Sequence, residues 1–368
     1  MQGGKFALGE ARLTRAETAA PGLAPSQEAA RPVRVAHFMR GPLDEIFSVE
    51  RIFDDVRAAL PGDIQVDVIR SARPNKGFVP RLMNALNARR HRSEVNHVLG
   101  DTQYLAWFLP RSRTILTVLD CVSLDRLSGW RRWVLWFFWY WWPLKRAGQV
   151  TVISDFTRQA LLSWVRYPED RISIIPPPLS AEFGPAEPRP FAEWSRLLHI
   201  GITPNKNLKR VIEAVTGLEV TLILVGQLRE DLKEMLVERG IRYETYQGLD
   251  RDGLVEQYRN ADMLVFPSTY EGWGMPILEA QAVGRPVVTS TVTAMPEAAG
   301  GAACLVDPFD VASIRAGIRR ILDDEAYARG LIEAGFENAA KYRGDRIAAD
   351  YAALYRSVAA GDGAGSRG

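Results

Sequence analysis

Apolar residues between Pro32 and Ala359 fall into short continuous runs that alternate with amphipathic stretches. The run Val33–Phe38 is followed by the amphipathic stretch Ser48–Leu60 and then by the run Ile64–Arg70. Short apolar runs favour buried strands, whereas apolar residues spaced three and four apart favour a helix. Two further strands are expected at 115–119 and 150–153. This alternation predicts a parallel sheet covered by helices on both faces.

A proline-rich stretch interrupts this pattern at Ile175-Pro-Pro-Pro-Leu179 and again at Gly184-Pro-Ala-Glu-Pro-Arg-Pro190. Proline lacks an N–H group, so it continues neither a helix nor a central strand. We therefore predict a linker at 179–192. After it, we expect strands at 197–200, 221–225, 263–266 and 286–289, and helices at 208–215, 231–239, 251–260 and 276–283.

The repeated pattern predicts an α/β fold of two Rossmann-like domains that face a cleft, with ligands beyond the carboxyl ends of the strands. The first domain is expected at 31–178 and the second at 193–343, and a helix near 344–358 is expected to pack back on the first. Residues 1–30 mix small and charged residues without an apolar segment, so we expect a disordered arm and not a signal peptide. Residues 360–368 are expected to form a disordered tail.

Charge and cysteine content exclude several functional classes. The 46 Lys and Arg residues are almost balanced by 44 Asp and Glu residues, which gives no electrostatic basis for binding nucleic acid. Cys121 and Cys304 are far apart and form no metal-binding pair, and the four histidines show no ligand spacing. We therefore expect neither a disulfide framework nor a bound metal.

The segment Trp130–Arg146 holds six of the ten tryptophans and is too short to span a bilayer. Tryptophan rings flanked by Arg and Lys suit the headgroup region of a membrane, so we predict binding to a membrane surface. Replacement of Trp136 and Trp139 by Ser is then expected to release the protein from anionic liposomes. The alternative is a buried core helix or a subunit contact.

The segment from Tyr270 to Ala280 carries the strongest chemical pattern. A predicted strand ends before this segment, and Gly272 and Gly274 allow the backbone to approach a ligand closely. Pro276 begins a predicted helix, whose first N–H groups can bind an anion such as a diphosphate. Glu271 precedes the glycines and Glu279 is expected in the first turn of the helix. The two carboxylates are thus expected on opposite sides of the phosphate position.

Glu271 and Glu279 together resemble the E-x7-E signature of the family-four glycosyltransferases, which are retaining enzymes with the two-domain GT-B architecture. The resemblance implies that Glu271 contacts hydroxyls of the donor sugar and that Glu279 binds the nucleotide ribose. It also implies that backbone amides around Trp273, Gly274 and Met275 meet the sugar and the phosphates.

Two further segments resemble the same family. His199-Ile-Gly-Ile-Thr-Pro-Asn-Lys-Asn-Leu208 matches a glycine-then-R-K-N element, which implies that Lys206 neutralises the diphosphate near Gly201. Asn205 stands where many relatives have arginine, so one cation is missing there. Thr117-Val-Leu-Asp120 matches a segment near the acceptor, with Asp120 retained and Leu119 in place of a frequent histidine.

The resemblance implies metal-independent transfer of a hexosyl group from a nucleotide-diphosphate sugar to an acceptor hydroxyl. We expect a glycan or lipid-linked acceptor at the cytoplasmic face of the plasma membrane, as in cell-surface polysaccharide synthesis. Two alternatives stay open. Glu271 and Glu279 could be the acid and the nucleophile or base of a glycoside hydrolase. The chain could also be a catalytically weak or inactive membrane-bound scaffold that binds nucleotide sugars.

Overall fold

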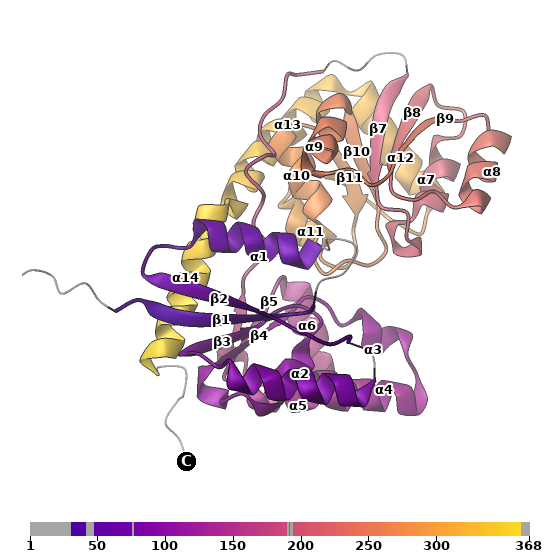
Figure 1. Ribbon diagram of the computed structural model, residues 1–368. Coiled ribbons are helices and arrows are strands. Elements are labelled where there is room, and N and C mark those ends of the chain that lie inside the picture. Colours follow the sequence, from indigo (N-terminus) through magenta and orange to yellow (C-terminus); the bar gives the residue numbers. More distant parts are fainter. Residues whose placement is uncertain (1–30, 42–47, 76, 190, 192–193, 362–368) are drawn as a thin grey trace, which may run out of the picture. The chain divides into compact units, whose positions relative to one another are not determined.

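The computed structural model describes residues 31–41, 48–75, 77–189, 191 and 194–361. The arm predicted at 1–30 lies outside these residues, as does the part of the predicted tail at 362–368. Within the described ranges the strands form two sheets of six, and every strand pairs in parallel with its neighbours (Figure 1). The predicted fold class of two Rossmann-like α/β domains is confirmed.

The first sheet has the strand order β2-β1-β3-β4-β5-β6. Its strands are β1 (Val33–Met39), β2 (Ile64–Arg70), β3 (Val95–Val98), β4 (Thr114–Val118), β5 (Gln149–Val152) and β6 (Ile172–Ile174). All residues of β3 and β4 are buried, as expected for central strands covered on both faces. The carboxyl ends of β3 and β4 lead into loops that contribute to the site.

Helices cover both faces of the first sheet. On one face, α1 (Ser48–Ala59) packs with α14 (Gly344–Ala360), and Phe53 meets Tyr351 in the core between them. The other face is covered by α2 (Phe78–Arg90), α5 (Trp142–Arg146) and α6 (Asp155–Trp164). Figure 1 shows α1 and α2 on opposite sides of the strands.

A buried hydroxyl fastens α14 to the first sheet. The Tyr355 oxygen lies 2.9 Å from His37 Nε2 and 2.8 Å from His97 Nδ1. The helix is longer than expected, because it runs through Ala360 and ends at Gly361 in the left-handed conformation. Residue 360 therefore belongs to the helix and not to the predicted tail.

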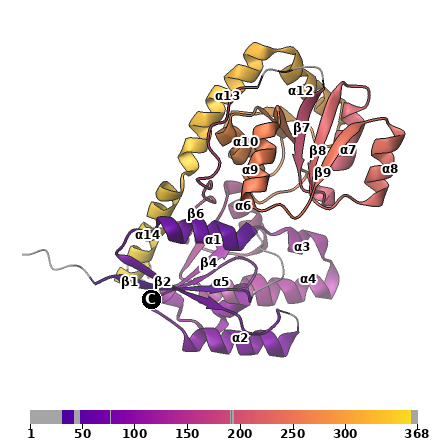
Figure 2. The same cartoon turned by 45° about the horizontal axis from the view of Figure 1, so that its top comes forward.

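The second sheet has the order β12-β11-β10-β7-β8-β9. Its strands are β7 (Ser195–Ile200), β8 (Val220–Val225), β9 (Arg242–Tyr246), β10 (Met263–Phe266), β11 (Val287–Ser290) and β12 (Cys304–Val306). The helices around it are α7 (Leu208–Val215), α8 (Glu230–Glu238), α9 (Arg251–Asn260), α10 (Met275–Val283), α11 (Met295–Ala299), α12 (Val311–Asp323) and α13 (Glu325–Ala339). Figure 2 shows α9 and α10 on one side of the strands and α7 and α8 on the other.

Backbone hydrogen bonds hold the predicted linker region against the segment between α13 and α14 and against the end of α10. Leu179 forms an isolated parallel bridge with Arg343, and its N–H group donates to the Tyr342 carbonyl at 2.7 Å. Further along, the Ala186 N–H group donates to the carbonyl of Val283 at 3.1 Å. These bonds satisfy backbone groups that a proline-rich segment leaves without regular secondary structure.

The tryptophan-rich segment is not one regular helix. After α3 (Val122–Arg126) come α4 (Gly129–Leu135), a π-helical stretch at Trp136–Trp141, and α5. A π-helical stretch rotates the residues that follow it relative to an α-helix, so residue spacing alone does not give their directions.

Trp136 and Trp139, the two tryptophans chosen for the liposome test, are only partly exposed. Trp136 and Trp139 pack partly against the first core, and their indole N–H groups donate to the carbonyls of Trp164 and Asp101. The exposed rings are instead Trp130, Trp133 and Trp141, at 73%, 58% and 38%.

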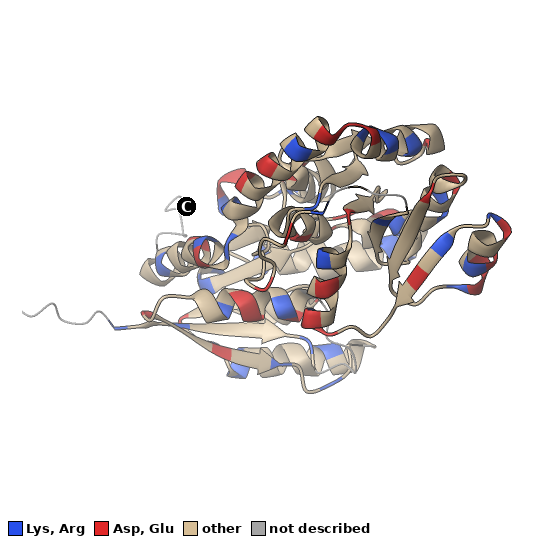
Figure 3. Ribbon diagram, turned by 90° about the horizontal axis from the view of Figure 1, so that it is seen from above, with Lys and Arg blue, Asp and Glu red and all other residues tan. Residues whose placement is uncertain are grey.

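Charged residues of both signs are mixed along the outer helices (Figure 3). No helix in the described part of the chain is long and apolar enough to cross a membrane.

Candidate active site

A pocket of about 470 Å³ contains most of the residues singled out by the sequence. It lies where the loop after β10 meets α1 and the segment that follows β4. The predicted residues that line it are Asp120, Lys206, Glu271, Gly272, Trp273, Gly274, Met275 and Glu279. Gly201 and Asn205 do not line the pocket, but each contacts a residue that does.

Glu271 is held by three donors. Lys206 Nζ lies 2.7 Å from Glu271 Oε1, and Ser268 Oγ and Asn205 Nδ2 donate to the same oxygen at 2.8 and 3.2 Å. The Lys206 and Glu271 side chains are only 21% and 19% exposed, so the pair is better shielded from water than a surface ion pair. The arrangement fixes the carboxylate at the edge of the pocket.

Gly201 permits this position of Lys206. The glycine has φ +84°, which favours a residue without a side chain, and an added Cβ would lie 3.1 Å from Lys206 Cε. The lysine stem therefore passes directly over the glycine at the end of β7.

Asn205 joins two loops of the second sheet. Its side-chain amide donates to the Tyr270 carbonyl at 3.1 Å as well as to Glu271, and its own carbonyl accepts from the Thr269 N–H group at 2.8 Å. The sequence suggested only the loss of a cation at this position. In the structure the amide supplies neutral hydrogen bonds to the loop that carries Glu271.

The position expected for Glu279 in the first turn of the helix is wrong. Because α10 begins at Met275, Glu279 is its fifth residue and lies in the second turn. Burial raises the pKa of its carboxyl group to about 6, although the Tyr258 hydroxyl, which donates at 2.5 Å, lowers it. Glu279 faces the same pocket as Glu271.

Contacts within the protein also require the two glycines of the loop. A Cβ on Gly272 would lie 2.3 Å from the Leu119 carbonyl oxygen, and one on Gly274 would lie 2.8 Å from Met295 Cε. The sequence explained both glycines by the approach of a ligand. The structure adds that Gly272 lets the loop after β10 touch the loop after β4.

Further hydrogen bonds tie the start of α6, which follows β5, to the loop after β10 and to α11. Ser154 Oγ donates to the Gly272 carbonyl at 2.8 Å, and both carboxylate oxygens of Glu297 accept from the Asp155 N–H group at 3.0 Å. The contact fixes the first residues of α6 beside the glycine-containing loop.

The beginning of α10 faces the pocket through Gly274, Met275 and Pro276. Pro276 lies at the second helical position. The helix start presents N–H groups without intrahelical partners and the positive end of the helix dipole, which together suit an anionic group. The Trp273 ring is 5% exposed and packs against Tyr342, so this residue lines the pocket with little of its side chain.

Asp120 follows β4 and accepts a hydrogen bond from the Val122 N–H group at 3.1 Å. Burial raises the pKa of its carboxyl group, and the nearby carboxylates of Glu271 and Asp101 raise it further. The backbone carbonyl of Leu119 accepts a hydrogen bond from the Thr157 hydroxyl at 3.3 Å. No imidazole stands at position 119.

Sequence reasoning missed several charged residues of the pocket. Arg51 and Asp55 come from α1, and Arg251 from the start of α9. Arg251 binds both oxygens of Asp55 at 3.0 and 3.1 Å and donates to Ser180 Oγ at 2.8 Å. These residues belong to no local motif, so only the folded chain shows that they meet.

No group of three or more His, Cys, Asp and Glu side chains placed to hold a metal ion occurs in the described ranges. The positive charge in the pocket comes instead from Lys206, Arg51 and Arg251.

Comparison with known proteins agrees with the geometry. Residues 198–338 match the family model described as glycosyl transferases group 1. The O-antigen chain mannosyltransferase B of Escherichia coli is 36% identical over 219 residues, which cover 52% of this chain and 57% of that protein. The MMP alpha-(1->4)-mannosyltransferase of Mycolicibacterium hassiacum is 29% identical over 225 residues, which cover 57% and 54% of the two chains. The matches thus span little more than half the length of these relatives.

Solved structures resemble the fold over more of the chain. HepE of Anabaena in complex with UDP-glucose superposes with a TM-score of 0.71 at 15% identity, covering 88% of this chain and 99% of that one. WaaG, a glycosyltransferase involved in lipopolysaccharide biosynthesis, gives a TM-score of 0.67 at 16% identity over 87% and 99% of the chains. The chain therefore has the GT-B architecture, and its second sheet carries the match to the group 1 glycosyl transferases.

Proposed function

We propose that this chain is a retaining glycosyltransferase that moves a hexosyl group from a nucleotide-diphosphate sugar to an acceptor hydroxyl. The observation that carries the proposal is the Lys206–Glu271 pair beside the start of α10, within one pocket. The matched family model and the mannosyltransferase relatives support this class of reaction. Synthesis of a surface polysaccharide or a lipid-linked glycan is the process that the relatives favour.

The pocket offers a separate partner to each part of the donor. The N–H groups at the start of α10 and the Lys206 ammonium stabilise the diphosphate as it leaves with increasing charge. Glu271 accepts hydrogen bonds from the transferred sugar, and Glu279 accepts them from the ribose. Positive charge from the protein replaces that of a metal ion, so we propose a metal-independent reaction.

The environment of Glu271 argues against a glycoside hydrolase. Lys206, Asn205 and Ser268 all donate to Glu271 Oε1. A carboxylate pair that hydrolyses a glycoside needs neither this lysine nor a helix start in the same pocket, whereas a leaving diphosphate is stabilised by both. Product formation that requires both a nucleotide sugar and an acceptor supports transfer, whereas release of sugar from a glycan without nucleotide supports hydrolysis.

Turnover of site variants distinguishes an enzyme from an inactive scaffold. We expect Glu271→Ala and Lys206→Ala to lose at least about tenfold in transfer rate, as removal of groups that stabilise the transition state does. Lys233→Ala is the matched control, because Lys233 is half exposed and pairs with Glu230 on α8. Equal, low turnover in all four proteins would support the scaffold.

We further propose that an aromatic surface holds the enzyme at the cytoplasmic face of the plasma membrane. This surface consists of Trp130, Trp133, Phe137 and Trp141. Trp133 and Trp141 stack on opposite sides of Phe137 with ring centroids 5.6 and 5.2 Å away. Arg131 and Lys145 lie over Trp130 and Trp141, so cations accompany exposed rings, as suits anionic headgroups.

Sedimentation with anionic liposomes tests this surface. We expect Trp130→Ser together with Trp133→Ser to reduce binding, because both rings are more than half exposed. Phe309→Ser is the control, because Phe309 is 59% exposed but follows β12 in the second sheet. Unchanged binding of the double variant would refute the membrane proposal and leave the transferase proposal intact.

A further inference from the structure

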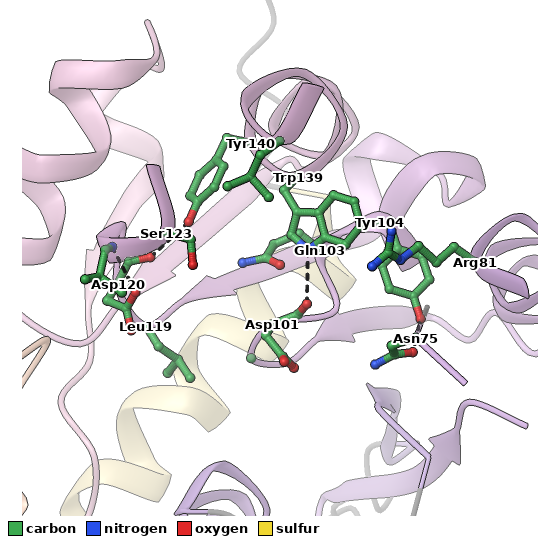
Figure 4. A pocket seen from close by; sticks show the side chains of 13 residues that line it. Asn75, Arg81, Asp101, Gln103, Tyr104, Leu119, Asp120, Ser123, Trp139 and Tyr140 are labelled. Carbon is green, nitrogen blue, oxygen red and sulfur yellow. Dashed lines mark hydrogen bonds between the residues drawn. The ribbon is translucent and has the colours of Figure 1, made fainter. Parts of the chain in front are cut away.

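A second cavity, of about 390 Å³, adjoins the candidate active site, and we call it the side pocket. Leu119 and Asp120 line both cavities, so the two meet at the segment after β4. The other walls come from α2, from the loop after β3 and from the π-helical stretch (Figure 4). The volume lies within the range of pockets that hold small ligands.

The side pocket contains a buried polar group without a protein partner. Gln103 is 5% exposed, and its Oε1 atom makes no hydrogen bond within the described residues. Figure 4 shows its amide directed into the space between Asp101 and Asp120. An unsatisfied buried amide costs about 1–3 kcal/mol, so a ligand that donates to it recovers that loss.

Arg81 supplies a second unused group on the opposite wall. Its guanidinium carbon lies 4.3 Å from the centre of the Trp139 ring, and its buried Nε atom has no partner among the described residues. No carboxylate in the described ranges forms an ion pair with it. Burial lowers the pKa of the guanidinium, but the group stays protonated.

The composition of the pocket fits hydroxyl groups better than an anion. Asp101 and Asp120 only accept hydrogen bonds, Arg81 only donates, and Gln103 does both. Each hydroxyl of a sugar can likewise donate and accept. Arg40 also lies 3.6 Å from Asp101, so the two carboxylates face two guanidinium groups and the pocket has no excess positive charge for a phosphate or carboxylate ligand.

Aromatic rings complete the walls. The Tyr104 and Trp139 ring centroids are 5.7 Å apart, and the Tyr140 hydroxyl donates to the Asp120 carbonyl at 3.3 Å. Tyr104 and Tyr140 are buried and support Trp139, whose partly exposed ring gives rigid apolar contact for the C–H face of a sugar ring. The pocket therefore combines hydroxyl partners with apolar surface.

We propose that the side pocket binds the terminal neutral sugar ring of the acceptor glycan, with Gln103 and Arg81 as specificity-determining contacts. The inference rests on the proposed transferase function. Asp120 lies where the two cavities meet, so a ring in the side pocket places one hydroxyl toward the donor sugar.

Binding of neutral oligosaccharides to the full chain tests this assignment directly. The probes are trisaccharides that end in mannose, glucose or galactose, each observed by saturation-transfer NMR with the unaltered protein. We expect at least one probe to bind, and Gln103→Leu to weaken its binding at least fivefold. Gln65→Leu is the matched control, because Gln65 is exposed on β2 and outside both pockets. Arg81→Met provides a second test if Gln103→Leu fails to fold.

Three results would overturn the assignment: no probe binds, the bound probe is unaffected by both variants, or inorganic phosphate displaces it. A parallel measurement of protection against heat by nucleotide sugars separates this inference from the proposed function. If nucleotide sugars protect the parent and Gln103→Leu equally while the substitution leaves oligosaccharide binding unchanged, that result refutes the side-pocket assignment but leaves the donor site intact. Absence of protection in the parent refutes the donor site.

Discussion

The Lys206 ammonium lies 2.7 Å from the Glu271 carboxylate, although the two residues follow different strands of the second sheet. The pair brings a positive charge to the edge of the pocket and at the same time orients an acceptor of hydrogen bonds. In the proposed reaction, the diphosphate of the donor would meet a lysine whose position is already fixed, as in preorganised catalytic sites.

Removal of the lysine tests that arrangement. We expect Lys206→Ala to reduce the transfer rate by roughly 100-fold, the typical effect of losing one preorganised electrostatic group. Lys206→Arg is expected to recover only part of the rate, since its planar guanidinium does not reproduce a compact ammonium. Initial rates at saturating donor check this. Equal rates for the parent and the Ala variant would contradict the assigned role.

Replacement of Glu279 is expected to change stability with pH. Burial raises the folded pKa of its carboxyl group to about 6, above the ordinary value of 4.5, so the folded state binds the proton more tightly. The stabilisation of the folded state by the protonated Glu279 carboxyl group is present below pH 4.5 and is lost as the pH rises through 6. Relative to the parent, Glu279→Gln should therefore gain up to about 2 kcal/mol between these values.

Denaturant unfolding of both proteins from pH 4.5 to 7 measures that difference. The same substitution is expected to weaken nucleotide binding, because a neutral amide is a poorer partner for ribose hydroxyls than a carboxylate. A stability difference that stays flat with pH would show that the Glu279 carboxyl group is not the one that titrates.

Substitution of Gly272 tests the contact between the loops. In Gly272→Ala the new Cβ would meet the Leu119 carbonyl at 2.3 Å, so the two loops must move apart. We expect at least tenfold lower activity and a lower melting temperature. Gly330→Ala is the control, because it lies within α13 with no atom within 4 Å of the new Cβ and should stabilise the helix slightly. Full activity of Gly272→Ala would be incompatible with the close contact.

Loss of the Tyr355 hydroxyl tests how α14 is held. Tyr355→Phe leaves nitrogens of His37 and His97 without their buried partner, which is expected to cost about 1–3 kcal/mol. The free energy of unfolding in denaturant measures this cost, and donor protection should be retained. A cost below about 0.5 kcal/mol would mean that the hydroxyl contributes little to the attachment.

Local patterns predicted much of the fold. The apolar run at β1 predicted that strand to within one residue, because buried parallel strands need continuous apolar residues, and β2 was predicted from apolar residues that alternate with polar ones. The strand β9 was not predicted, because Arg242–Tyr246 is mostly polar. It lies at the edge of its sheet and pairs with only one strand, so its residues need not be apolar. The three residues of β12 are too few to produce a pattern.

The site likewise contains residues that a local motif predicted and residues that meet only in the folded chain. Glu271, the glycines and Glu279 lie within one strand-loop-helix unit, so their meeting in one pocket was predictable from spacing. Arg251 and Asp55 meet only through folding. Gln103, Arg81 and Trp139 also come from three separate segments, and the π-helical stretch sets the direction of Trp139.

Protection of the folded chain by nucleotide sugars tests the central claim most directly. A donor at one hundred times its dissociation constant should add about 2.7 kcal/mol to the stability of the parent, seen as a rise in melting temperature. We predict that at least one nucleotide-diphosphate sugar gives this protection and that Lys206→Ala loses most of it at the same concentration. No protection of the parent by any donor, or equal protection of both proteins, would contradict a donor site built on Lys206, Glu271 and the start of α10.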